Sequence, residues 1–94
     1  MKFLKNQVIK IIYAPSFGRE FIKLGKHLQE EAFEKIKSFQ DPKNHKQLKV
    51  HKLHGHLKNR YSFTVNYQYR IVFNFLSKNE AVFLSVGDHD VYKR

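Results

Sequence analysis

The fold is decided by residues 61–86, which read YSFTVNYQYRIVFNFLSKNEAVFLSV. Aromatic and β-branched residues occupy every second position in 61–67 and again in 69–76. A period of two is typical of a strand with one buried face. Residues 77–80 (SKNE) supply turn chemistry, and the apolar run 81–86 follows them. This stretch therefore predicts an antiparallel meander of three strands.

The residues before the meander predict one strand and a pair of helices. Residues 8–13 (VIKIIY) are short and rich in β-branched side chains, which favours a strand that can join one edge of the sheet. Ala14 and Pro15 are expected to end this strand, and Ser16 is expected to cap the N-terminus of the first helix. Gly25 marks a break between that helix and the next.

The second helix is expected over residues 27–40, ending at Asp41 and Pro42 because proline removes a hydrogen-bond donor and restricts the residue before it. Four apolar residues at helical spacing predict its buried face: Leu28, Ala32, Ile36 and Phe39. A helical hairpin packed on one face of the sheet gives an α+β fold. No repeat or linker divides the chain, so residues 1–94 are expected to form a single domain.

Composition excludes several classes of protein. With 94 residues, no cysteine and 41% hydrophobic residues, the chain can build a core but not a disulfide scaffold or a thiolate metal site. No apolar run is long enough to span a bilayer, and the N-terminus lacks the apolar stretch of a signal peptide. The sequence therefore predicts a cytoplasmic protein without a membrane partner.

The charge is large and unevenly distributed. The chain carries 18 Lys and Arg against 8 Asp and Glu, a formal charge of +10, and no carboxylate occurs from residue 42 to residue 79. Such a segment attracts phosphates, so we expect it to contact a nucleic acid, RNA or DNA, although it could also be a solvated basic surface. Its candidate contact residues are Lys43, Lys46, Lys49, Lys52, Lys58 and Arg60.

Three residues suit the chemistry of a phosphodiester. The guanidinium of Arg70, in the middle of an apolar strand, can hold phosphate oxygens, although it could instead pair with Asp88 or Asp90. His89, flanked by those two carboxylates, can act as a general acid, and Tyr92 can donate a proton or stack on a base.

Histidines at positions 51, 54 and 56 could be imagined as a metal site, but in an extended segment His51 faces away from His54 and His56. Neighbouring lysines would also repel a cation. We therefore expect no metal and no other cofactor.

The order of these motifs resembles the RelE/ParE superfamily of bacterial toxins over about residues 8–92. The most specific parts are Tyr69-Arg70-Ile71-Val72-Phe73 and the terminal His89-x-x-Tyr92, supported by Leu53-x-Gly55-x-Leu57-Lys58. The resemblance implies the toxin of a type II toxin–antitoxin system, with an antitoxin as its partner. RelE-like members cut mRNA on the ribosome without a metal, using the RNA's own 2′-hydroxyl as the nucleophile.

The resemblance also implies roles for individual residues. Arg70 matches the phosphate-binding arginine, and His89 and Tyr92 match residues that protonate the leaving group or orient the base. The chain departs from RelE at Ser62 and Thr64, where RelE has lysines, so His51 and His54 are the candidates for the general base. This departure leaves open the ParE alternative, a toxin that inhibits DNA gyrase and is not a nuclease.

Overall fold

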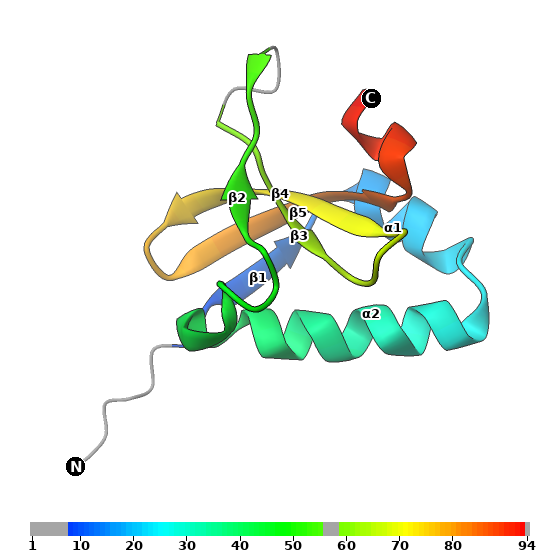
Figure 1. Cartoon of the computed structure of the whole chain (residues 1–94), viewed down its shortest axis with the longest axis horizontal. Coiled ribbons are helices and arrows are strands. Elements are labelled where there is room, and N and C mark those ends of the chain that lie inside the picture. Colours follow the sequence, from blue (N-terminus) through cyan, green and yellow to red (C-terminus); the bar gives the residue numbers. More distant parts are fainter. Residues whose placement is uncertain (1–7, 56–58, 94) are drawn as a thin grey trace.

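The computed structural model describes residues 8–55 and 59–93, and for His89 and Lys93 it describes the backbone only. Within these residues, helices and strands form an α+β structure (Figure 1). The helices are α1 (Pro15–Ile22) and α2 (Lys26–Phe39), with short 3-10 helices η2 (Pro42–Asn44) and η4 (His89–Lys93). The strands are β1 (Lys10–Tyr13), β2 (His51–Lys52), β3 (Tyr61–Thr64), β4 (Arg70–Ser77) and β5 (Glu80–Gly87). In the described part of the chain no helix has the length and apolar character needed to cross a membrane.

The five strands form one sheet in the order β1-β5-β4-β3-β2. Strands β3, β4 and β5 are antiparallel neighbours, which confirms the predicted meander. β1 joins the edge of the meander parallel to β5, as expected for the first strand. β2 was not predicted: part of the basic connector pairs with β3 and extends the sheet at its other edge.

Proline and asparagine account for two differences from the predicted boundaries. Ser16 is not the N-cap of α1, because the helix begins at Pro15 with Ala14 in the capping position. Pro15 suits the first helical turn, where its missing N–H would have no partner, and the Ser16 hydroxyl donates to the Leu84 carbonyl at 2.6 Å. β3 ends at Thr64 and not at residue 67, because Asn66 Oδ1 accepts the backbone N–H groups of residues 68 and 69 and turns the chain.

The α2 helix matches its prediction closely. It spans Lys26–Phe39, with Gly25 at the N-cap, where the break between the helices was expected. Asp41 and Pro42 follow its end and start η2, in which the Asp41 carboxylate accepts the backbone N–H of Lys43 at 3.0 Å. The helix therefore ends where proline forbids its continuation.

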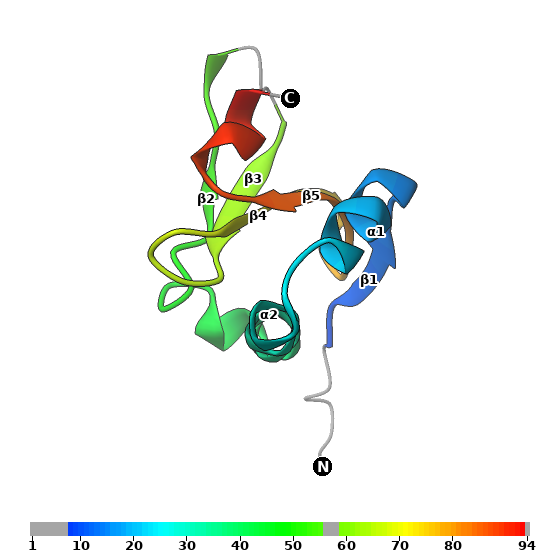
Figure 2. The ribbon, with the colours of Figure 1, turned by 90° about the vertical axis from the view of Figure 1, so that its right-hand side faces the viewer.

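Phe39 lies at the centre of the core, with no solvent exposure. Its ring stacks on Phe63 at 4.8 Å between centroids and meets the edge of Phe73 at the same distance. The ring of His45 stacks on it at 4.6 Å and its Nε2 lies 2.7 Å from the Phe39 carbonyl oxygen. In Figure 2, α2 runs along one side of the sheet and η4 lies on the other. The sheet thus has an apolar face covered by α2 and a second face toward η4.

Candidate functional site

The second face of the sheet is built by the residues between the core positions of β3 and β4. Phe63, Ile71 and Phe73 are fully buried in the core cluster. Since side chains alternate along a strand, Ser62, Thr64, Arg70 and Val72 belong to the opposite face. η4 lies above this face, where Val72 and Val91 are each only 3% exposed. We call this surface the η4 face.

β2 adds His51 to the η4 face. His51 pairs directly with Ser62 in the antiparallel ladder, and directly paired side chains lie on the same side of a sheet. Its Nδ1 lies 2.9 Å from the carbonyl oxygen of Lys49. Because a carbonyl oxygen only accepts, Nδ1 is the donor in this contact, and in the tautomer that it favours the unprotonated nitrogen is Nε2. His51 thus has the tautomer that a general base requires.

The C-terminal 3-10 helix brings Tyr92 to the same place. The Tyr92 hydroxyl lies 3.0 Å from Ser62 Oγ, and Ser62 is fully buried. A hydroxyl–hydroxyl hydrogen bond therefore joins β3 to the terminal tyrosine. The structure brings together His51, Ser62 and Tyr92, although His51 and Tyr92 are 41 residues apart in the sequence.

Arg70 lies at the start of β4, opposite Thr64, and not in the middle of its strand as expected. Standard strand spacings place its Cα about 12 Å from that of His51, two strands across and two residues along. Its Nη1 donates to the carbonyl oxygens of Asn66 at 2.8 Å and Tyr69 at 3.2 Å. A guanidinium has five N–H donors, so a half-buried Arg70 that bonds the turn through Nη1 can also bind phosphate oxygens.

The alternative partner for Arg70 is not observed. Among the described residues, neither Asp88 nor Asp90 pairs with Arg70, and the contact between a basic and an acidic side chain is that of His27 Nδ1 with Glu30 at 4.0 Å on α2. The Asp88 carboxylate instead accepts the backbone N–H of Asp90 at 3.0 Å. The guanidinium is therefore held by carbonyl oxygens and not by a carboxylate.

The remaining predicted residues are distributed as follows. Lys43, Lys46, Lys49 and Lys52 are exposed and Arg60 is half-buried. His54 is exposed beyond the end of β2. Lys58 and the side chain of His89 lie outside the described residues. Among the residues that are described, no group of three His, Asp or Glu could hold a metal ion.

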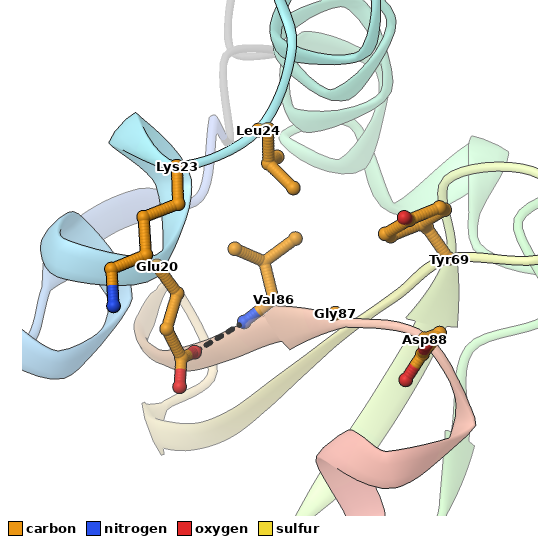
Figure 3. A pocket seen from close by; sticks show the side chains of 7 residues that line it. All are labelled: Glu20, Lys23, Leu24, Tyr69, Val86, Gly87 and Asp88. Carbon is orange, nitrogen blue, oxygen red and sulfur yellow. Dashed lines mark hydrogen bonds between the residues drawn. The ribbon is translucent and has the colours of Figure 1, made fainter.

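One pocket beside the root of η4 was not anticipated from the sequence (Figure 3). It measures about 340 Å³ and lies between the end of α1 and the end of β5, with Leu24, Val86 and Tyr69 directed toward its centre. The Glu20 carboxylate accepts the Val86 N–H at 3.0 Å and ties α1 to β5. In the sequence Glu20 is an ordinary acid in a helix, and nothing there signals this contact.

One described ionisable group is clearly perturbed. Burial raises the pKa of the Tyr13 phenol above its ordinary value. Tyr13 ends β1, at the sheet edge opposite β2. This perturbation therefore lies at the β1 edge of the sheet and not on the η4 face.

Comparison with known proteins identifies relatives of this arrangement. Residues 17–89 match the family model described as the HigB-like toxin, a RelE-like toxin of the type II toxin–antitoxin system HigB. No curated protein matches the sequence.

Solved structures share the fold at low sequence identity. The toxin–antitoxin complex RelBE2 from Mycobacterium tuberculosis matches with a TM-score of 0.71 and 17% identity, over 87% of this chain and 99% of that chain. The YoeB–YefM complex from Staphylococcus aureus matches with a TM-score of 0.68 and 21% identity, over 86% and 97%. YafQ from E. coli matches with a TM-score of 0.65 and 15% identity, over 89% and 97%.

Proposed function

The chain belongs to the HigB-like family of RelE-like toxins of type II toxin–antitoxin systems, and from this premise we propose that it is a ribosome-dependent mRNA endonuclease. It would cut mRNA by attack of the RNA's 2′-hydroxyl on the adjacent phosphate and so inhibit translation in the cytoplasm. The observation that carries the proposal is His51, whose Nδ1–H is bound by the Lys49 carbonyl and whose Nε2 is available on the face that also carries Tyr92 and Arg70.

Each proposed role follows from the chemistry of transesterification. His51 Nε2 takes the proton of the 2′-hydroxyl, whose oxygen then forms a bond to phosphorus. Arg70 stabilises the negative charge that develops on the phosphoryl oxygens. The bond from phosphorus to the 5′-oxygen breaks, and His89 supplies the proton to that oxygen, while Tyr92 stacks on or orients the base. The products are a 2′,3′-cyclic phosphate and a 5′-hydroxyl.

The proposed partners are an antitoxin, the ribosome and mRNA. Two of the similar structures are complexes of a toxin with its antitoxin, which supports an antitoxin partner for this chain. The exposed lysines of residues 43–52 provide the positive surface for ribosomal RNA. The matching family model is RelE-like, so the gyrase-inhibitor alternative is not favoured.

The proposal is tested by mRNA cleavage in a reconstituted translation reaction. Loss of a positioned general base costs about 10²–10⁴-fold in rate, so we expect a decrease of this size for His51→Ala and little change for His54→Ala. Arg70→Ala should also lose activity. The matched controls are His27→Ala and Arg19→Ala, because both residues are exposed on helices away from the η4 face.

Cleavage by His51→Ala at the rate of the wild-type protein would remove His51 from the mechanism. A loss seen with His54→Ala alone would transfer the role of base to that residue. Thermal melting of each variant separates loss of chemistry from loss of fold.

A further inference from the structure

The turn between β3 and β4 is held in place by backbone and side-chain hydrogen bonds. Its backbone closes through Val65 N–H to the Tyr69 carbonyl at 2.9 Å, and Asn66 Oδ1 accepts two N–H groups at 2.8 Å each. Its two outer carbonyls, at residues 65 and 66, accept from Lys35 Nζ and Arg70 Nη1, again at 2.8 Å each. The Asn66 amide also donates to Glu31 at 2.9 Å, so α2 and β4 both anchor the turn.

This rigid turn presents an aromatic side chain to solvent. Tyr67 is 88% exposed, compared with 56% for Phe33 and 49% for Tyr13. Because the backbone of the turn is already ordered, stacking of a planar group on Tyr67 does not have to order the main chain as well. The Tyr67 ring is therefore accessible for stacking against a planar group, and it lies outside the core.

A groove of about 570 Å³ runs beside Tyr67, between α2, residues 47–49 and the end of β3. Its lining combines two cations, Lys35 and Lys49, with amide and hydroxyl groups that can bond base edges, and one carboxylate, Glu34. The polar members are Ser38, Gln47, Thr64 and Asn66. This volume lies in the range of small-ligand sites. The groove thus offers a ring for stacking, cations and hydrogen-bonding groups. This combination suits a nucleotide and not an apolar peptide.

The groove adjoins the η4 face. Lys49 lines the groove, and its carbonyl oxygen accepts the His51 Nδ1–H. Thr64 also lines the groove and pairs directly with Arg70. Because Glu34, Lys35 and Ser38 of α2 also line the groove, an RNA strand whose phosphate lies between His51 and Arg70 would reach it by passing around the end of β3.

We propose that this groove is a second binding site for single-stranded RNA, in which one base stacks on Tyr67 and a phosphate contacts Lys49. The site would hold a nucleotide flanking the cleaved one, and in this respect it rests on the proposed endonuclease function. Lys49 itself adopts a left-handed backbone conformation, with φ of 60°. Glycine adopts this conformation more readily than residues with a side chain. The backbone therefore does not explain why position 49 holds a lysine.

The test is a binding titration of the full chain with a fluorescent, fully 2′-O-methylated, single-stranded RNA oligonucleotide, which cannot be cut. Base stacking on an aromatic ring predicts that Tyr67→Ala weakens binding about 5- to 150-fold. Tyr67→Phe should bind as the wild type does. The matched control is Phe33→Ala, because Phe33 is also an exposed aromatic but lies on α2 beside Lys37.

Lys49→Gly gives a second, independent readout. Removing one phosphate contact should lower the slope of log K against log salt by about 0.7. Since glycine accepts the observed φ, the melting temperature should not fall.

Equal affinity of Tyr67→Ala and wild type, or no binding by the wild type, would overturn the proposal. Because the probe cannot be cleaved, these results are separate from those of the cleavage assay. If the protein does not cleave mRNA but its RNA binding still depends on Tyr67, the groove binds RNA without the proposed catalytic function.

Discussion

At the scale of the residue, Arg70 shows what a sequence can and cannot predict. Its position among apolar strand residues marks it as unusual, and the structure places it on the η4 face. Its partners could not be predicted, because the carbonyls of Asn66 and Tyr69 reach it only when the chain turns sharply at Asn66. Likewise, the tautomer of His51 depends on the Lys49 carbonyl, which no pattern of residue types reveals.

Phe39 provides a residue-scale prediction about stability. It is fully buried, and its ring contacts Phe63, Phe73 and His45. Phe39→Ala should lower the free energy of unfolding by about 3–5 kcal/mol, because it removes buried surface and leaves a cavity. Urea denaturation measures the change.

The control for this substitution is Phe33→Ala on the exposed side of the same helix. There the loss should stay below about 1 kcal/mol, since Phe33 is 56% exposed and its cation–π contact with Lys37 is a weak surface interaction. Comparable losses at Phe33 and Phe39 would contradict the assignment of the core.

At the scale of the element, Val91 and Tyr92 connect the short C-terminal helix η4 to the sheet. Val91 is buried beside the sheet, and the Tyr92 hydroxyl bonds Ser62 Oγ at 3.0 Å. The sequence marks Tyr92 through the terminal His-x-x-Tyr pattern but gives no sign that Ser62 is its partner. Residues 62 and 92 are far apart in the sequence, and only the pairing of β3, β4 and β5 brings them together.

We expect Ser62→Ala to destabilise the protein by about 0.5–1.5 kcal/mol, the net contribution of one hydrogen bond. Tyr92→Phe should have a similar effect on the free energy of unfolding. The double variant should cost less than the sum of the two, because both single changes remove the same bond. Additive losses in this cycle would show that the Ser62–Tyr92 contact does not hold η4.

Element boundaries show why local patterns are incomplete. The periodic stretches predicted α2, β4 and β5 to within one residue at each end, because burial of one face dictates their period. β3 ends three residues earlier than its period predicted. β2 escaped prediction because a strand of two residues, His51 and Lys52, has no detectable period. Its existence depends on pairing with β3, which is a tertiary interaction.

At the scale of the whole molecule, the charge asymmetry coincides with the two faces of the sheet. The carboxylates of Glu30, Glu31 and Glu34 belong to α2, which covers the apolar face. β2, β3 and β4 contribute no carboxylate to the η4 face, since none occurs in residues 42–79. The strands of the proposed site are therefore accessible to a polyanion. The carboxylates nearest to this site are Asp88 and Asp90 at η4, and a second group of acids lies on α2.

The central claim is that RNA is cut by its own 2′-hydroxyl on the η4 face, and the ends of the products test it most directly. Purified wild-type protein, ribosomes and mRNA would be incubated, and the fragments analysed by mass spectrometry. Attack by the 2′-hydroxyl predicts a 2′,3′-cyclic phosphate on the upstream fragment and a 5′-hydroxyl on the downstream one, both lost with His51→Ala. Fragments that carry a 3′-hydroxyl and a 5′-phosphate would contradict the mechanism, because they require water as the nucleophile.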